Sequence, residues 1–360
     1  MKYYTETNYM DHDDLRTAGG KGRDDYFEVL RRCGLECIRI PTLRKSTSLS
    51  IIDRLLLETR LRKVWKENLS KLGEGDVLVL HSPVSEKFTG YTRVINKVKK
   101  RGCRIVNIVF DLETFFMSDY RKAAYIKHAF DAKSEADLFR MSDVLIVHNK
   151  KMKEKIVSLG IDPGKIVCVG VMDYLRDDEP ADMDKRFSPD GPVVFCGNLL
   201  RSKSGFAYVL GDDFKIDLYG PGFTGRTSDK VNYRGVFTSL ELMDVMTGSF
   251  GLVWDGTSVK TCTGACGEYL SYNNPHKMSH YLASGMPVLI WKGAALAEFV
   301  TAEGCGVAIS SLDEIPGILQ SVSPEQYEML KMNAGRVGSE MREGVHIRKA
   351  VLKALDMLGE

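Results

Sequence analysis

A short segment in the last third of the chain combines a helix start with a lysine in its first turn. Within Asn273–Trp291, Asn274 is a good N-cap residue, Pro275 suits the first helical position, and Gly285 predicts the helix end. The free amides and dipole of a helix N-terminus favour an anion, so Lys277 is out of place there unless a negative group arrives. We therefore expect Lys277 to bind phosphate; the alternative is a surface lysine on an ordinary helix.

The rest of the chain alternates between short strand-like runs and segments of helix length. Val- and Ile-rich runs of this kind are typical of parallel strands joined by crossover helices. The expected strands are Val77–Leu80, Arg104–Phe110, Val144–Val147 and Ile166–Val169, then Val193–Cys196, Lys215–Tyr219, Gly251–Trp254 and Val288–Trp291. The pattern predicts an α/β protein with two doubly wound, Rossmann-like domains in tandem.

The boundary between these domains is predicted from a change in composition. Arg176–Asp190 is polar and acidic and contains two prolines, as expected of a linker. We expect an N-terminal domain over residues 1–172 and a C-terminal domain over 173–340. Residues 341–360 are expected to form a final helix that packs back toward the N-terminal domain.

Polar residues follow several of the expected strands at the points where they end. Ligands of open parallel sheets bind beyond the carboxyl ends of the strands. These positions hold His81, Asp111 with Glu113, His148, Asn198, Tyr219 and Asp255. Part of this pattern arises in any such fold, because strands must end in turns. Asp111 and Asp255 are the most informative positions.

Five segments, in order along the chain, resemble a known bacterial family. Asn273–Val288 (NNPHKMSHYLASGMPV) is similar to the donor-site segment of galactofuranosyltransferase-like and streptococcal glycoprotein glucosyltransferase-like enzymes. The other similar segments are Asp111–Glu113, Phe195–Leu199 with Arg201–Lys203, Leu218–Gly222 and Gly251–Gly256. The resemblance implies the GT-B fold, in which two Rossmann-like domains face each other across a cleft, and a UDP-sugar donor.

The resemblance also implies roles for individual residues. Lys277 and Arg201 would hold the diphosphate, because charge-assisted contacts are strong and stabilise the leaving nucleotide. The remaining donor-site residues are Asn198, Tyr219, Asp255, Asn274 and His276. In the N-terminal domain, a glycine-rich loop that faces the donor is expected from Asn8, Gly19, Gly20 and Lys21.

The acceptor side of the site needs a general base if the transfer inverts the sugar configuration. Asp111 is the first candidate, and Glu113 and His81 are the alternatives. A carboxylate at this position could instead cap the following helix, and the choice between inversion and retention stays open.

Composition and charge limit the kinds of partner and the location that we expect for this chain. A net charge of +2 on 360 residues gives no reason to expect nucleic acid binding. No apolar run approaches the roughly 20 residues that span a bilayer, and the N-terminus lacks an apolar signal core, so we expect a cytoplasmic protein. No Asp-x-Asp follows a strand, and GT-B enzymes use protein cations instead, so neither a metal nor another cofactor is expected.

The basic segment Ile51–Leu72 has an amphipathic pattern with two interpretations. Its apolar residues could pack on the core, or they could meet a membrane surface or a partner subunit, including a second copy of the chain. The overall prediction is a metal-independent hexosyltransferase that uses UDP-glucose, UDP-galactose or UDP-galactofuranose. The acceptor is a surface polysaccharide, a lipid-linked glycan or a glycoprotein. The alternatives are a sugar-nucleotide epimerase or hydrolase of the same fold, and a non-catalytic partner of a transferase.

Overall fold

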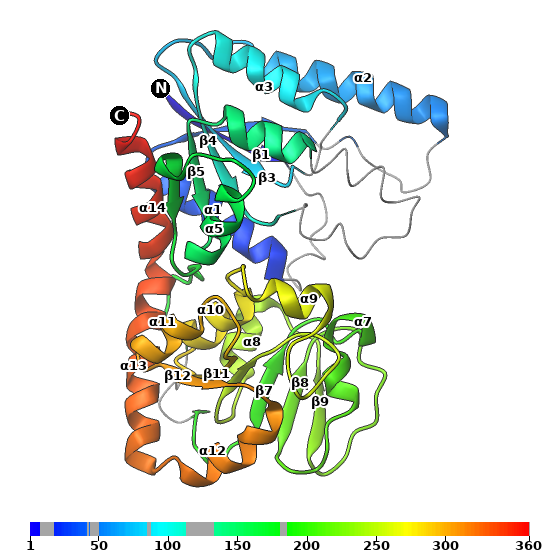
Figure 1. The fold of residues 1–360 in the computed structure, drawn as a ribbon, viewed down its shortest axis with the longest axis vertical. Helices are drawn as coiled ribbons and strands as arrows, with labels where there is room; N and C mark the ends of the chain where they lie inside the picture. The colour runs from blue at the N-terminus through cyan, green and yellow to red at the C-terminus, as the bar shows by residue number, and fades with distance from the viewer. Residues whose placement is uncertain are drawn as a thin grey trace.

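The computed structural model describes residues 1–7, 18–41, 43, 50–84, 88–112, 133–180 and 186–359. They form two parallel six-stranded sheets, which occupy the upper and lower halves of Figure 1. The first sheet has the order β2-β1-β3-β4-β5-β6. Its strands are β1 (Lys2–Thr7), β2 (Glu36–Ile40), β3 (Val77–Ser82), β4 (Arg104–Val109), β5 (Val144–Val147) and β6 (Ile166–Cys168).

The second sheet has the order β12-β11-β10-β7-β8-β9. Its strands are β7 (Val193–Cys196), β8 (Ile216–Tyr219), β9 (Val231–Gly235), β10 (Gly251–Val253), β11 (Val288–Trp291) and β12 (Gly306–Ile309). Read from the β9 edge, this is the strand order of dinucleotide-binding folds. Two doubly wound parallel sheets confirm the predicted fold class.

The strands of the first sheet are apolar because helices cover both of its faces. Val77 and Val79 of β3 pack with α1 (Ala18–Arg32) and α14 (Val345–Asp356). The alternate residues, Leu78 and Leu80, pack on the other face with α2 (Ile51–Asn68) and α3 (Tyr91–Lys100). Full burial of one such side chain stabilises the fold by about 1.5–3 kcal/mol. Among the described residues, this half also contains helix α5 (Lys150–Val157).

The second sheet is surrounded by helices α7 (Arg201–Ser204), α8 (Ser239–Val245), α9 (Gly264–Tyr269), α10 (His276–Ala283), α11 (Ala297–Ala302), α12 (Ile315–Ser321) and α13 (Pro324–Glu343). Short 3₁₀ turns are η3 (Pro163–Lys165), η4 (Gly205–Tyr208) and η5 (Leu312–Glu314). Helix α10 lies in a tight space between β10 and α13. A Cβ at Gly251 would stand 2.2 Å from the Tyr281 ring, and one at Gly338 would stand 2.0 Å from the Leu282 carbonyl oxygen.

The chain ends by crossing from the second half to the first. Helix α13 packs on α10, and Gly344, with a φ of 80°, ends it in the left-handed region. Helix α14 then packs on α1, β5 and β6 of the first sheet. Figure 1 shows α13 and α14 running along one side of both halves.

Helix α2 is packed at one end only. Leu61, Trp65 and Leu69 are buried in the first half of the molecule, as expected of a core helix. Toward its N-terminal end, Ile52, Leu55 and Leu56 are 71%, 64% and 51% exposed. Figure 1 shows this end of α2 extending away from the first sheet. The C-terminal part of α2 therefore packs on the core. Its N-terminal part exposes apolar side chains, as contact with a membrane surface or a partner subunit would require.

Candidate active site

Helix α10 holds Lys277 at the carboxyl edge of the second sheet. The ammonium donates to the Trp254 carbonyl oxygen at 2.8 Å and pairs with an Asp255 carboxylate oxygen at 2.8 Å. It also lies 4.6 Å from the centre of the Phe195 ring. Burial lowers the pKa of Lys277, and Asp255 opposes that effect. A nearly buried cation is thus fixed where the central strands β7 and β10 end.

A cavity of about 360 Å³ opens beside this lysine. Five residues predicted for the donor site line it, namely Asn198, Tyr219, Asp255, His276 and Lys277. Tyr174, Lys203 and His280 also line it, and none of these was among the predicted site residues. The cavity therefore combines two lysines with aromatic and imidazole rings, as a site for an anionic, ring-containing ligand requires.

A second cavity, of about 370 Å³, continues from the first toward the N-terminal half. The two share Lys203, Asp255 and Asn273 in their walls. Pro83 and Asp111, which follow strands of the first sheet, line only the second cavity. A ligand held beside Lys277 could therefore meet a second ligand held beside Asp111 at the shared wall.

Asp111 is contacted from the opposite half by Tyr269 of α9. The Leu112 amide donates to the Tyr269 hydroxyl oxygen at 3.0 Å, and that hydroxyl also hydrogen-bonds to the Asp111 carboxylate. Asp111 keeps contact with solvent, yet the enclosing walls of the cleft raise its pKa by desolvation, and the Tyr269 hydrogen bond opposes the rise. Glu113, the second predicted base, lies outside the described residues.

Arg201 and Asn198 are placed less directly at the cavity than Lys277. The Arg201 guanidinium is exposed and lies 4.1 Å from the centre of the Tyr208 ring, and Arg201 lines neither cavity. Two residues later, Lys203 lines both cavities. The Asn198 side-chain oxygen accepts from the Leu200 amide at 2.9 Å, which shapes the turn after β7.

Asn274 does not cap the donor helix. Helix α10 begins at His276, its N-cap is Pro275, and no side chain caps it, so the prediction of an Asn274 cap is wrong. The reason is that the first half of the molecule uses the Asn274 side chain. Asn274 is 2% exposed and lines neither cavity.

The backbone amide and the side-chain amide of Asn274 both form hydrogen bonds to the N-terminal half. Its backbone amide donates to His148 Nδ1 at 3.0 Å, and its side-chain amide donates to the carbonyl oxygens of His148 and Gly170 at 3.2 and 3.1 Å. Its side-chain oxygen accepts from Asn149 at 2.7 Å. Burial lowers the pKa of His148 to about 3, which keeps Nδ1 an acceptor. This network fixes the residue before α10 to the ends of β5 and β6.

The expected glycine-rich loop is helical where it is described. Gly19, Gly20 and Lys21 belong to the first turns of α1, so the loop prediction is wrong for these residues, and Asn8 lies outside the described residues. The backbone of the next residue, Gly22, lies close to the His276 ring, because a Cβ at Gly22 would stand 2.0 Å from His276 Nε2. Helix α1 thus borders the start of α10 through its backbone.

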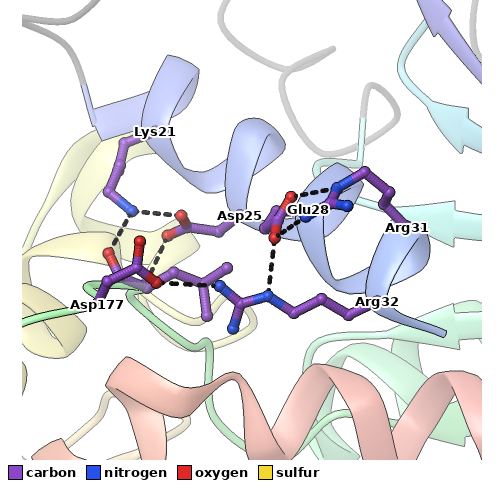
Figure 2. Close-up of polar contacts among 7 residues, drawn as sticks. Lys21, Asp25, Glu28, Arg31, Arg32 and Asp177 are labelled. Carbon is purple, nitrogen blue, oxygen red and sulfur yellow. Dashed lines mark hydrogen bonds and ion pairs between the residues drawn. The ribbon is translucent and has the colours of Figure 1, made fainter.

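Lys21 contacts the segment that follows β6 (Figure 2), and it lines neither cavity. Its ammonium bonds to the Asp25 carboxylate and to the Leu175 carbonyl oxygen at 2.8 Å. It also lies 4.8 Å from the centre of the Tyr174 ring, which lines the first cavity. Burial raises the pKa of Asp25 to about 6, against the effect of Lys21. Lys21 therefore supports the cavity wall from behind.

Within the described ranges, no three His, Cys, Asp or Glu side chains come together as a metal site requires. None of the helices in the described part of the chain has the length and apolar character needed to cross a membrane.

Two parallel sheets whose carboxyl ends meet at continuous cavities define a GT-B glycosyltransferase architecture. Similar solved structures include sucrose-phosphate synthase from Thermosynechococcus elongatus, with a TM-score of 0.64 and 12% identity over 100% of this chain and 99% of that one. Another is Anabaena HepE in complex with UDP, with a TM-score of 0.59 and 11% identity over 99% and 100%. At this identity the likeness concerns the fold alone.

The chain belongs to the glucosyltransferase 3-like family. The family model of the N-terminal domain matches residues 2–171, and that of the C-terminal domain matches 193–354. A beta-1,6-galactofuranosyltransferase of Escherichia coli K12 is 30% identical over 95% of this chain and 96% of its own length. Glucosyltransferase 3 of Streptococcus gordonii is 24% identical over 80% and 81%. The predicted family and enzyme class are confirmed, and the protein is a glycosyltransferase.

Proposed function

We propose that this glycosyltransferase moves a glucosyl, galactosyl or galactofuranosyl unit from a UDP-sugar to a hydroxyl of a glycan acceptor. The observation that carries the proposal is the nearly buried Lys277 at the wall of a cavity lined by a second lysine, Lys203. The galactofuranosyltransferase and glucosyltransferase relatives support hexosyl transfer, and the UDP complex of HepE supports the donor.

In this proposal the diphosphate lies between Lys277 and Lys203. It replaces Asp255 as the partner of Lys277 and is also stabilised by the N-terminal amides of α10. Arg201 would contact the diphosphate only if its guanidinium moved away from the Tyr208 ring. These protein cations stabilise the leaving nucleotide without a metal or another cofactor.

The acceptor hydroxyl is proposed to lie in the second cavity, where Asp111 accepts its proton. Glu113 is the second candidate for this role. The Tyr269 hydroxyl contacts Asp111 from the other half of the cleft, which supports a defined carboxylate position. Because desolvation in the cleft raises the pKa of Asp111, activity should begin to fall at a higher pH than for an ordinary carboxylate, as acid protonates this base.

The two cavities support an assignment of roles to the predicted domains. Residues 1–172 would hold the acceptor, residues 173–340 the donor, and the chain after 340 would return to the first domain. The acceptors we propose are a bacterial surface polysaccharide, a lipid-linked glycan or a glycoprotein, modified in the cytoplasm. The exposed apolar end of α2 supports contact with the inner membrane face or with a second copy.

The test is a transfer assay with UDP-glucose, UDP-galactose and UDP-galactofuranose, each with and without glycan acceptors. The wild type should release UDP and form a glycosidic product only when an acceptor is present. Asp111→Asn should lower kcat by roughly 10²–10⁴-fold while UDP affinity stays within about twofold of the wild type. Interconversion of the sugar without acceptor would instead establish the epimerase alternative. UDP-N-acetylglucosamine 2-epimerase structures are 11% identical to this chain or less, so their likeness concerns the fold alone.

A further inference from the structure

A second polar ring stands in the wall of the first cavity, one helical turn beyond Lys277. His280 lines the cavity and is 5% exposed, and its Nε2 has no hydrogen-bond partner among the described residues. Buried polar atoms in native proteins are nearly always paired. An unpaired nitrogen in a cavity wall therefore points to a ligand that supplies the missing partner.

The His280 ring lies nearly parallel to two aromatic neighbours. Its centre lies 5.1 Å from that of Tyr174, with 17° between the planes, and 6.1 Å from that of Tyr281, with 16°. Lys21 lies beyond Tyr174, as described above, and the Tyr174 hydroxyl donates to the Ser239 carbonyl oxygen at 3.4 Å. This stack fixes the plane of the imidazole without using its nitrogens.

The position of His280 along α10 indicates which part of a donor it would meet. Three residues of helix separate it from Lys277, a rise of about 4.5 Å on the same side. In a nucleoside diphosphate, the ribose directly follows the phosphates. In a UDP-sugar the hexose flanks the diphosphate on the other side, and it must face the second cavity, where the acceptor is proposed to lie. His280 lines the first cavity and not the second, so if Lys277 binds the diphosphate, the group that His280 would meet is the ribose.

The charge state of His280 also suits a hydroxyl better than a phosphate. Burial lowers the pKa of His280 to about 3, with Lys21 and His276 acting in the same direction. The ring is thus neutral near pH 7 and offers one donor and one acceptor. A sugar hydroxyl can satisfy either, whereas a phosphate would prefer the cation of Lys277.

We propose that His280 hydrogen-bonds to a ribose hydroxyl of the nucleotide donor and so distinguishes ribonucleotide from deoxyribonucleotide donors. This inference rests on the proposed function, because it uses the diphosphate at Lys277 as its reference point. His280 is a specificity-determining residue in this scheme, and Tyr174 and Tyr281 position it.

The test is isothermal titration of the full-length protein with UDP, 2′-deoxy-UDP and 3′-deoxy-UDP. The wild type should bind at least one deoxy analogue about tenfold more weakly than UDP. His280→Ala should bind UDP about tenfold more weakly and bind that analogue as well as it binds UDP. His280→Gln, which keeps a donor and an acceptor, should retain part of the discrimination.

Within each variant, the ratio of the affinity for UDP to the affinity for the deoxy analogue is compared. A general loss of folding or binding would leave this ratio unchanged, whereas loss of the ribose contact would change it. Lys277→Met provides the second arm and should weaken all three ligands by a similar factor. If Lys277→Met binds UDP like the wild type, the proposed donor site fails. If Lys277→Met weakens binding but His280→Ala keeps the wild-type ratios, only the ribose contact is overturned.

Discussion

At the scale of single residues, the first cavity contains an ion pair between Lys277 and Asp255 in its wall. The two charges lie 2.8 Å apart, and the Lys277 and Asp255 side chains are 11% and 9% exposed. Removing one partner of a buried ion pair destabilises the fold more than removing one partner of an exposed pair. The reason is that the remaining charge is left without water or a counter-ion. Asp255 thus holds the lysine in place before an anion arrives.

Some of these residues could be predicted and others could not, for identifiable reasons. Lys277 stands out in the sequence because a cation in the first turn opposes the helix dipole. His280 lies on the same side of the same helix, so helical spacing alone could have found it. Tyr269 could not be predicted in the same way, because Leu112, its partner, is 157 residues away.

At the scale of elements, interior strands could be predicted more readily than edge strands, although the edge strand β6 was also predicted. β3, β4, β5, β7, β10 and β11 lie inside the sheets, are covered on both faces, and therefore appear as apolar runs. The strands β2, β9 and β12 were not predicted, and each lies at a sheet edge. β9, for example, carries Tyr233 and Arg234 toward solvent and has only one fully buried residue.

The start of α10 is the element most dependent on the other half of the molecule. Replacing Asn274 by Asp exchanges the donating amide for a carboxylate oxygen that faces the carbonyl oxygens of His148 and Gly170. We expect Asn274→Asp to lower the free energy of unfolding by about 3 kcal/mol and to weaken UDP binding, because α10 loses its anchor.

Urea unfolding followed by circular dichroism would measure this change. Asn68→Asp is the matched control, because Asn68 is exposed and its side-chain amide makes a single bond, to the Val64 carbonyl oxygen. Equal stability of Asn274→Asp and Asn68→Asp would show that the network does not hold the two halves together.

At the scale of the whole molecule, buried histidines make stability depend on pH. Burial lowers the pKa values of His81, His148 and His280 to about 3 and that of His276 to about 4. In the unfolded chain these groups titrate near 6.5. As the pH falls below about 6.5, the unfolded state therefore takes up protons that the folded state does not, and each histidine contributes a loss of stability.

His81 isolates this effect, because it packs among Phe27 and Phe110 and neither ring nitrogen has a hydrogen-bond partner among the described residues. His81→Leu should flatten the dependence of unfolding free energy on pH by about 1.4 kcal/mol per pH unit between roughly pH 6 and 4. Denaturant unfolding of both proteins at several pH values would measure it. Parallel curves for variant and wild type would mean that His81 is not buried as a neutral ring.

The two halves of the molecule also meet through their linker and last helix. Lys21 and Asp25 of α1 bond to Leu175, and Arg32 pairs with Asp177 at 3.2 Å (Figure 2). Asp173 accepts from the amide of Ile347 at 2.6 Å and contacts the His346 ring at 2.7 Å at the start of α14. These contacts, like those of Asn274, keep the second cavity next to the first.

The central claim is that Lys277 binds the diphosphate of a UDP-sugar, and calorimetric titration with UDP tests it most directly. Lys277→Met keeps the length of the side chain and removes its charge. We predict that it weakens UDP binding by about 100-fold, or ~2.7 kcal/mol. Lys292→Met is the control and should bind like the wild type, because Lys292 is exposed after β11 and lines neither cavity. Wild-type affinity in Lys277→Met would contradict the account.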